Sequence, residues 1–410
     1  MKMKKLLITL FLLSLIFLNI NYNFSLALED DSKEPSPSAI SAILLDNRTN
    51  KVLYKKEENK KMYPASTTKI LTAILVLENC NLNDVVTSSY NAIMSVPEGY
   101  SIAKIQIGEQ LTVEQLLELL LVYSANDAAN VLAEYVGGST DSFVAMMNTK
   151  INELGLTDSH FTNPYGLHDE NHYTTAHDLA VIMQYCLKNE NFRKIAGQAS
   201  CAIPATNLYG PRSFDSTNEL LIPGNPYYYK YLTTGKTGFT SPAKECLVSS
   251  AYRDDLELIC VVLGSDNRFS DTRTIYEYGY ENYSIKNIAN ENDVITNIKV
   301  SNATKNTKNL DLLICEPIYA LVKNSDFDNE IIPEIILNKN ISAPIEEGAI
   351  LGKVKYTING VTYTTDLIAA HAVESIQFLD LALYAGSALI LSLFGYEIFL
   401  VVKNSRRKDK

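Results

Sequence analysis

The chain has 410 residues, enough for two domains with sizeable hydrophobic cores. Its 47 acidic residues outnumber its 36 lysines and arginines, which gives a formal net charge of −11. Because nucleic acids attract basic surfaces, this acidic balance argues against nucleic acid as a partner.

The N-terminus has the pattern of a secretory signal peptide. Three lysines within residues 1–5 precede the apolar stretch 6–20, and Ser-Leu-Ala at 25–27 fits a small-residue cleavage site. We therefore predict a signal peptide over residues 1–27. Residues 28–38, rich in acidic residues, serine and proline, are predicted to link it to the folded part.

A hairpin and a helix come next. Residues 39–46 and 51–54 predict two strands joined by a turn at 47–50. An apolar run then reaches Leu77, and it predicts a buried helix that begins at or near Ser66.

Ser66 and Lys69 lie three residues apart and would therefore share one face of this helix. A serine hydroxyl is a weak nucleophile at neutral pH, and a neutral lysine beside it could accept its proton. Free lysine has a pKa of about 10.4, so lowering it to about 7 must disfavour the ammonium form by roughly 4 to 5 kcal/mol. Burial and a second cation would supply that energy, so the pocket should contain another lysine or arginine. A Ser-x-x-Lys sequence alone occurs often by chance.

A polar segment separates the next two predicted helices. Thr112 and Gln115 have the spacing of a capping box before a leucine-rich helix that runs to about Tyr123. The following helix is predicted over residues 128–135 and is stopped by two glycines. The polar residues 124–127 between them would ordinarily be no more than a loop.

This loop also has a functional interpretation. It places Ser124 and Asn126 at the lip of the Ser66 pocket, where a hydroxyl can pass on a proton and an amide can bind a peptide group. The sequence of the loop by itself leaves both interpretations open.

Three of the five histidines lie close together in the sequence, after a predicted helix over 143–154. His168 and His172 are four residues apart, a spacing that also occurs in zinc sites. The metalloprotease pattern needs glutamate directly after the first histidine, on a helix, whereas Asp169 follows His168 in a loop with proline and glycine. We therefore predict hydrogen-bonded loop histidines and no metal, followed by a helix over 175–187.

Lys236, Thr237 and Gly238 lie just before or on a predicted strand at the edge of an antiparallel sheet. Strand-like runs over 246–252 and 256–264 follow, joined by a tight turn. A Gly-x-x-x-x-Gly-Lys-Thr phosphate loop is the rival interpretation, but it needs a glycine where this sequence has a lysine.

The sequence predicts a β-rich domain over residues 285–374. Its strand-like runs are 298–300, 311–315, 331–337, 353–358 and 361–365. Asn359 and Gly360, between the last two runs, are typical of a two-residue hairpin turn. No residue pattern there indicates chemistry, so we expect a stalk or a partner-binding surface.

Residues 381–402 are apolar apart from Glu397 and would span about 33 Å as a helix, enough for the hydrocarbon core of a membrane. Basic residues dominate 403–410 and would hold this tail in the cytoplasm. We predict a single-pass protein at the cell membrane whose body lies outside the cytoplasm. A buried core helix is the alternative for this stretch.

The six cysteines lack the close spacing of a small disulfide-stapled domain. Most of them lie within or beside apolar runs, so we predict free, buried thiols, none of them a nucleophile.

Three motifs occur in order, about 60 and then about 110 residues apart: Ser66-x-x-Lys69, Ser124-x-Asn126 and Lys236-Thr237-Gly238. Together they resemble the motif set of penicillin-recognising serine enzymes. The surrounding sequence, including Asn-Pro-x-Gly-Leu at 163–167, is similar to low-molecular-mass D-alanyl-D-alanine carboxypeptidases (penicillin-binding proteins) over about residues 39–283.

The resemblance implies an α+β fold. It has a β-lactamase/transpeptidase-like catalytic domain, here residues 39–284, in which helices cover an antiparallel sheet. Residues 343–353 resemble part of the small β-sandwich that follows in many members, here residues 285–374, before a C-terminal transmembrane helix over 381–402. Relatives often anchor through an amphipathic helix on the membrane, and many have glycine where this chain has Lys244.

The resemblance also implies residue roles in catalysis. Ser66 would attack the peptide carbonyl between two D-alanines and form an acyl-enzyme, with Lys69 as the base. Ser124 and Asn126 would complete the proton relay and hold the substrate backbone.

Substrate binding is implied for the strand motif. Lys236 and Thr237, with Gly238 beside them, would bind the terminal carboxylate, and Lys236 would be the second cation that a neutral lysine requires. The oxyanion would be held by the backbone amides of Ser66 and Phe239.

The implied function is a serine-type carboxypeptidase that trims D-alanine from peptidoglycan stem peptides, is acylated by β-lactams and uses no cofactor. A transpeptidase would use the same residues with an amine as acceptor. A β-lactamase would need an added glutamate, for which Glu170 is the candidate in this region. A non-catalytic sensor of β-lactams or muropeptides is the alternative outside the enzymes.

Overall fold

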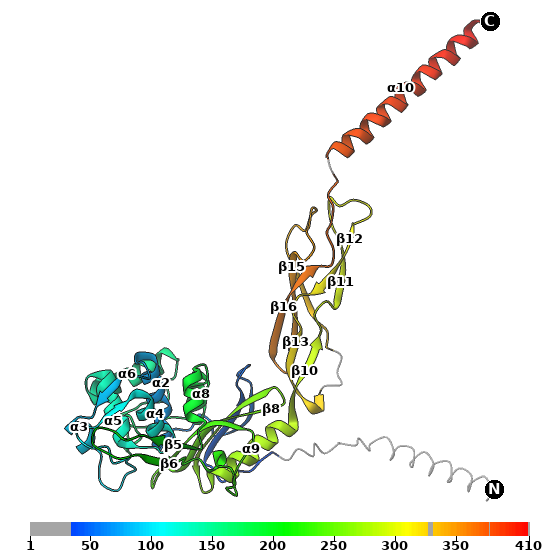
Figure 1. The fold of residues 1–410 in the computed structure, drawn as a ribbon. Coiled ribbons are helices and arrows are strands. Elements are labelled where there is room, and N and C mark those ends of the chain that lie inside the picture. The colour runs from blue at the N-terminus through cyan, green and yellow to red at the C-terminus, as the bar shows by residue number, and fades with distance from the viewer. Residues whose placement is uncertain (1–33, 327–330, 377, 409–410) are drawn as a thin grey trace, which may run out of the picture. The chain divides into compact units, whose positions relative to one another are not determined.

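The computed structural model describes residues 34–326, 331–376 and 378–408. The predicted signal peptide, the first part of the predicted linker and the last two residues of the predicted tail lie outside these ranges. The described residues form two compact units (Figure 1): the first ends at Asn282 and leaves out Asp254–Leu256, and the second begins at Tyr283 and includes those three residues. Each unit has its own hydrophobic core.

The first unit is built on a five-stranded sheet with the order β2-β1-β9-β8-β7. Its strands are β1 (Ser41–Asp46), β2 (Val52–Lys56), β7 (Leu232–Thr240), β8 (Lys244–Arg253) and β9 (Leu256–Ser265). β1 pairs antiparallel with β2 and with β9, and β7 pairs antiparallel with β8. The predicted hairpin, the two predicted strands after Gly238 and the edge position of β7 are confirmed.

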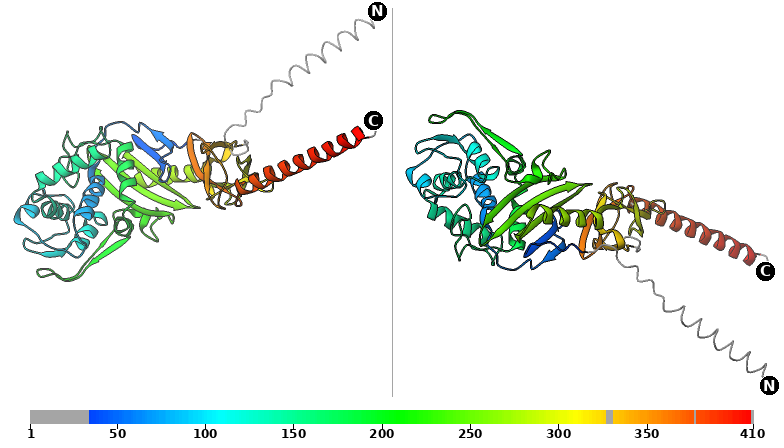
Figure 2. Two further views of the ribbon diagram at one scale, coloured as in Figure 1. Left: turned by 90° about the horizontal axis from the view of Figure 1, so that it is seen from above. Right: turned by 90° about the horizontal axis from the view of Figure 1, so that it is seen from below.

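Helices cover both faces of this sheet. They are α2 (Lys69–Asn79), α3 (Tyr90–Met94), α4 (Val113–Leu121), α5 (Asn126–Gly137), α6 (Thr140–Glu153), α7 (Ala176–Cys186), α8 (Glu190–Ala196) and α9 (Arg268–Asn282), with the 3-10 turns η1 (Ala65–Thr68) and η2 (Glu219–Leu221). Ile43 and Leu45 of β1 belong to the main helical core, whereas Leu44 between them lies against Gly279 of α9. Successive strand residues point to opposite faces, so the sheet lies between α9 and the other helices (Figure 2). The predicted α+β arrangement is confirmed.

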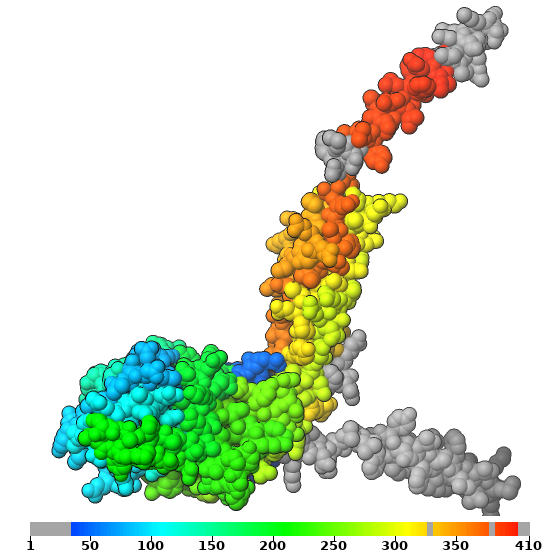
Figure 3. All heavy atoms as spheres, viewed as in Figure 1, coloured from blue at the N-terminus to red at the C-terminus, as the bar shows by residue number. Residues whose placement is uncertain are grey.

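α2 is the central helix of this unit. It packs against α4, α5, α6, α7 and α8, and every residue from Lys69 to Val76 is buried. The helical segment begins near Ser66, as predicted, but its first turn is the tighter η1, and the α-helix proper begins at Lys69. The space-filling view shows the helical part, coloured blue to cyan, in direct contact with the green segments that follow it (Figure 3).

The capping box before α4 is present. Gln115 N donates to Thr112 Oγ1 at 3.2 Å, and Thr112 N donates to Gln115 Oε1 at 2.8 Å. α5 begins at Asn126, two residues earlier than predicted, because Ser124 has a left-handed φ of 70° that turns the chain straight into the next helix. Two small sheets were not predicted: β3 (Val85–Thr87) with β4 (Gln110–Thr112), and β5 (Ser200–Ile203) with β6 (Arg212–Asp215).

All six cysteines are free thiols, as predicted. Four of them are buried, whereas Cys80 and Cys315 are partly exposed. The prediction of burial is therefore wrong for these two.

The second unit is rich in strands. β10 (Tyr283–Ala289) pairs with β13 (Ile318–Lys323), and a five-stranded sheet has the order β11-β12-β16-β15-β14. Its members are β11 (Val294–Lys299), β12 (Asn309–Ile314), β14 (Glu334–Leu337), β15 (Ile350–Ile358) and β16 (Val361–Ala369). Asn359 and Gly360 have φ values of 50° and 78° between the paired residues Ile358 and Val361, so the predicted hairpin turn is confirmed.

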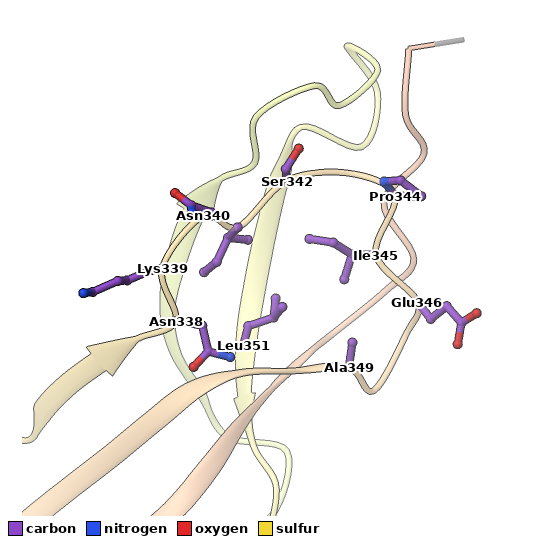
Figure 4. A pocket seen from close by; sticks show the side chains of 10 residues that line it. Asn338, Lys339, Asn340, Ser342, Pro344, Ile345, Glu346, Ala349 and Leu351 are labelled. Atoms are coloured by element: carbon purple, nitrogen blue, oxygen red, sulfur yellow. The ribbon is translucent and has the colours of Figure 1, made fainter.

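A groove lies beside β14 and β15 in this unit (Figure 4). Its floor contains Ile345 and Leu351, whereas the side chains of Lys339 and Glu346 point away from it (Figure 4). Ile345 is held by two backbone hydrogen bonds with Val373, of 3.0 and 2.8 Å. The polar side chains of Asn338, Asn340 and Ser342 line the groove together with these apolar ones, and the bridge between Ile345 and Val373 fixes one side of it.

The chain ends in the helix α10 (Phe378–Lys408). Within it, Ala382–Leu400 is long and apolar enough to cross a membrane. The predicted membrane span at 381–402 thus falls within one continuous helix, whose length and apolar composition fit such a span.

Candidate active site

Ser66 lies in η1, a turn that its own threonines stabilise. Thr67 and Thr68 donate their hydroxyls to the carbonyl groups three residues earlier, at 2.7 and 2.8 Å. Thr68 Oγ1 also lies 2.9 Å from Nε2 of the buried His172. These bonds fix the turn, so that the partly exposed Ser66 is held above Lys69.

Lys69 is completely buried, and its amine lies at the centre of the site. Nζ lies 2.7 Å from Ser66 Oγ, 2.7 Å from Asn126 Oδ1 and 2.9 Å from the carbonyl oxygen of Tyr165. Burial, and next the positive charge of Lys236, hold the pKa of Lys69 well below its usual value, while Asp127 opposes this shift. Burial and the charge of Lys236 thus both favour the neutral amine over the ammonium form.

Lys236 is the second cation that the sequence analysis required. It lies on β7 with 1% of its surface exposed, and Nζ donates to the Thr237 carbonyl at 2.9 Å. Burial, with a smaller contribution from Arg268, lowers the pKa of Lys236 to about 7. The hydroxyl of Thr237 lies 2.6 Å from that of Thr217, which fixes its direction.

Gly238 explains how β7 reaches the nucleophile. A Cβ atom at this position would lie 2.9 Å from Ser66 N and 2.9 Å from the Pro64 carbonyl oxygen, so a side chain would push the strand away from η1. Arg268 Nη1 donates to the Gly238 carbonyl at 2.7 Å and holds this edge from α9. The Phe239 side chain is 62% exposed, so this residue can contribute its backbone amide without filling the pocket.

Asn126 reaches the site as the first residue of α5, and Ser124 lies in the turn before this helix. The side-chain oxygen of Asn126 accepts the hydrogen bond from Lys69 Nζ, and the backbone N–H of Asn126 donates to Ser101 O at 2.9 Å. Ser124 is 7% exposed, but its hydroxyl makes no hydrogen bond to any other described residue. The structure thus joins Ser66, Lys69 and Asn126 into one network, and no hydrogen bond between described residues connects Ser124 to it.

Three contributors to the site had no role in the sequence analysis. The Tyr165 carbonyl binds Lys69, Arg268 holds the β7 edge, and Asp127 accepts the backbone N–H groups of Ala103 and Ile105, both at 3.0 Å. Asp127 directly follows Asn126 in the sequence, which is the one local signal that could have drawn attention to it.

Among the histidines of residues 168–177, His172 is the hydrogen-bonded loop anchor that was predicted, whereas His168 makes a ring contact with Tyr63 and His177 lies on α7 beside Asp178. The hydroxyl proton of Thr68 goes to a carbonyl group, so His172 donates through Nε2 and accepts the Thr162 N–H at Nδ1, 3.1 Å away. Burial lowers the pKa of His172 to about 3, and the ring stays neutral. Glu170, the candidate for a β-lactamase-type glutamate, is exposed.

The geometry can support acyl transfer to a serine. A hydroxyl lies in contact with a buried amine that can take its proton, and a second buried cation on the adjacent strand can bind an anionic group of the substrate. Within the described residues no group of histidine, cysteine and acidic side chains is arranged to bind a metal.

Comparisons with known sequences point to the same chemistry. Residues 29–267 match the family described as D-alanyl-D-alanine carboxypeptidase, and residues 283–375 match the C-terminal domain of penicillin-binding protein 5. The D-alanyl-D-alanine carboxypeptidase DacF of Bacillus subtilis is 32% identical over 347 residues, which cover 83% of this chain and 86% of that protein. The D-alanyl-D-alanine carboxypeptidase of Streptomyces sp. strain K15 is 33% identical over 269 residues, with coverages of 60% and 89%.

Solved structures agree in fold. PBP3 of Streptococcus pneumoniae, a peptidoglycan synthesis regulatory factor, superposes with a TM-score of 0.69 at 25% identity and covers 83% of this chain and 100% of that one. The DD-transpeptidase of Streptomyces K15 gives 0.57 at 33% identity, with coverages of 61% and 99%.

Proposed function

The chain belongs to the D-alanyl-D-alanine carboxypeptidase family, and we propose that it removes the terminal D-alanine from peptidoglycan stem peptides through an acyl-enzyme on Ser66. The observation that carries this proposal is the 2.7 Å contact between Ser66 Oγ and the buried amine of Lys69, whose pKa is lowered. Release of D-alanine from an acyl-D-alanyl-D-alanine peptide by the purified protein is the direct test.

The proposed reaction begins with proton transfer from Ser66 to the neutral amine of Lys69. The serine oxygen attacks the carbonyl carbon of the penultimate D-alanine, and the backbone amides of Ser66 and Phe239 stabilise the resulting oxyanion. When the C–N bond breaks, the leaving amine takes up the proton, with Ser124 as the proposed relay. Water then hydrolyses the ester on Ser66 and releases the shortened peptide.

Substrate binding is assigned to the residues that surround this centre. Asn126 holds the peptide backbone, while Lys236 and Thr237 bind the terminal carboxylate beside Gly238. The family match supports β-lactams as covalent inhibitors that acylate the same serine. With penicillin the bond that breaks is the amide of the lactam ring, so the leaving group stays attached to the enzyme.

A transpeptidase would use the same first step and then an amine in place of water. The solved relative from Streptomyces K15 carries the name DD-transpeptidase, which is a specific reason to include an amine acceptor in the assay. Formation of a new peptide bond faster than hydrolysis would assign transpeptidation to this chain.

Replacing Lys236 with alanine should affect substrates with a free carboxylate much more than their amides. For the acid, kcat/KM should fall on the order of 100-fold or more, because a charge-assisted hydrogen bond to the substrate is lost. The change also removes a positive charge near Lys69, which slows both substrates equally. The ratio of the two kcat/KM values is therefore the quantity to measure.

The matched control for this substitution is Lys244→Ala. Lys244 lies on the neighbouring strand β8 and forms an exposed ion pair with Asp266, so its loss should leave the ratio unchanged. Equal losses on acid and amide in the Lys236 variant would contradict the carboxylate role.

We also propose that α10 anchors the protein as a single membrane span, with the catalytic unit outside the cytoplasm and the C-terminus inside. The apolar segment Ala382–Leu400 and the basic residues after it support this orientation. In intact protoplasts, external protease should digest the catalytic unit and spare a C-terminal epitope tag, whereas permeabilised cells should lose both. Loss of the tag without permeabilisation would reverse the proposed topology.

A further inference from the structure

The loop of residues 163–167 brings a backbone carbonyl group into the active site. Tyr165 O accepts a hydrogen bond from Lys69 Nζ at 2.9 Å, and Ser66 Oγ lies 3.4 Å from the same oxygen. Tyr165 is 5% exposed, so this contact is sheltered from water. A carbonyl oxygen can accept a hydrogen bond but cannot donate one. It therefore restricts how the amine of Lys69 can be oriented.

The neighbours of Lys69 Nζ define one productive orientation of the neutral amine, which has two N–H groups and one lone pair. Tyr165 O and Asn126 Oδ1, at 2.9 and 2.7 Å, accept the two N–H groups. The lone pair then faces Ser66 Oγ, 2.7 Å away. This is the direction needed to receive the serine proton.

Asn163 holds the carbonyl group in place. Its Oδ1 accepts the backbone N–H groups of Tyr165, Gly166 and Leu167 at 3.3, 2.8 and 2.9 Å. Its Nδ2 donates to the Leu167 carbonyl at 2.9 Å. From α2, Thr72 Oγ1 donates to the preceding carbonyl group of the loop at 2.5 Å. One side-chain amide thus closes the turn around the Tyr165 carbonyl, and Thr72 ties the turn to the helix that carries Lys69.

We propose that Asn163 is a positioning residue for acylation: it fixes the Tyr165 carbonyl and, through it, the direction of the Lys69 lone pair. The inference rests on the proposed function, because it assigns a role to Asn163 through a lysine that acts as the base. When the carbonyl is displaced, the amine can turn an N–H toward Ser66, and the serine proton then has no acceptor.

The hydrogen bond to Tyr165 also favours the ammonium form of Lys69, because a charged donor forms the stronger bond. Losing it should lower the pKa of Lys69, so the rise of the acylation rate with pH should occur at lower pH. The other groups that act on Lys69 are Lys236 on β7, Asp127 on α5, and His172 and the Tyr165 ring on the loop side. Asn163→Ala also removes the contact of Asn163 Nδ2 with His172 Nδ1, 3.2 Å away, whereas the hydrogen bond lost in Thr72→Val goes to the Pro164 carbonyl, so an effect common to both variants reports on the loop carbonyl.

The test follows acylation of the full-length protein in detergent by a fluorescent penicillin as a function of pH. For Asn163→Ala we expect the plateau of the acylation rate to fall on the order of 100-fold. The acid limb, the range of pH over which the rate rises to its plateau, should lie about one pH unit lower than in the wild type. Asn163→Asp keeps the acceptor oxygen and should restore the plateau to within about fivefold of the wild type. Thr72→Val removes the hydrogen bond from α2 to the loop and keeps the size of the side chain at residue 72. It should shift the acid limb in the same direction.

Asn148→Ala is the matched control. Asn148 makes two hydrogen bonds to the backbone of Phe161, of 2.8 and 3.0 Å, and so holds the start of the same loop without contacting the Tyr165 turn. Its loss should lower the unfolding midpoint but leave the acid limb where it is. If Asn163→Ala behaves like this control, or if Asn163→Ala does not fold and Thr72→Val leaves rate and pH profile unchanged, the positioning role is wrong. A wild-type protein that forms no penicillin adduct would instead refute the proposed function.

Discussion

Replacing Ser66 with alanine is expected to abolish both the penicillin adduct and the release of D-alanine. The nucleophilic oxygen is lost, and the buried amine of Lys69 has no hydroxyl to deprotonate. The loss of kcat should be on the order of 10⁶-fold, the scale that follows removal of a serine nucleophile. Intact-mass spectrometry after mixing with penicillin, and D-alanine assayed with an acyl-D-alanyl-D-alanine peptide, measure the two effects.

The fold should survive this change. Ser66 is partly exposed, and Lys69 keeps its contacts with Asn126 and Tyr165, so the free energy of unfolding should change by about 1 kcal/mol or less. Ser142→Ala, on the exposed side of α6, is a control that should keep full activity. An adduct of normal mass on the Ser66 variant would show that another residue is the nucleophile and would end the assignment.

Replacing Gly166 with alanine is expected to lower stability and acylation together. Gly166 has a φ of 87°, and a Cβ there would lie 1.8 Å from the Ala65 carbonyl oxygen and 2.9 Å from Ser66 N. The loop and η1 must therefore separate, which takes the Tyr165 carbonyl away from Lys69. We expect roughly 3 to 5 kcal/mol less unfolding free energy and an acylation rate reduced on the order of 100-fold. Urea denaturation would measure the unfolding free energy, and labelling with penicillin would measure the acylation rate.

Gly155→Ala separates backbone strain from the steric clash. Gly155 also has a positive φ, of 75°, but a Cβ there would meet no atom within 4 Å. This variant should lose about 1 to 2 kcal/mol and keep its acylation rate. If the two variants were equally active, the close approach of the loop to η1 would have no part in aligning the site.

The elements that the sequence predicted well are those with a local signal. The capping box of Thr112 and Gln115 satisfies backbone groups within four residues, and Asn359-Gly360 encodes its own turn. The strand that carries Lys236 was predictable because tight turns and β-type runs follow it directly. These signals do not depend on the rest of the fold.

What the sequence could not predict depends on tertiary contacts or on backbone atoms. Tyr165 serves the site through its carbonyl oxygen, which any residue would supply, so no side-chain pattern marks it. Arg268 reaches Gly238 from a helix 30 residues further along the chain. That helix, α9, was not predicted because tyrosine and threonine, with Gly279 against Leu44, form much of its buried face in place of a leucine stripe.

The two buried amines also set a thermodynamic cost on folding. An unfolded chain exposes both as ammonium ions, whereas the folded protein binds a proton at Lys236 with a pKa of about 7 and holds the pKa of Lys69 well below its usual value. Between pH about 7 and the pKa of free lysine, about 10.4, the unfolded state binds more protons than the folded state. Raising the pH within this range therefore stabilises the folded state, and lowering the pH destabilises it. For Lys236 alone the difference is on the order of 4 to 5 kcal/mol. The reactivity of the enzyme is therefore maintained by the remaining core, which must be stable enough to keep two amines out of water.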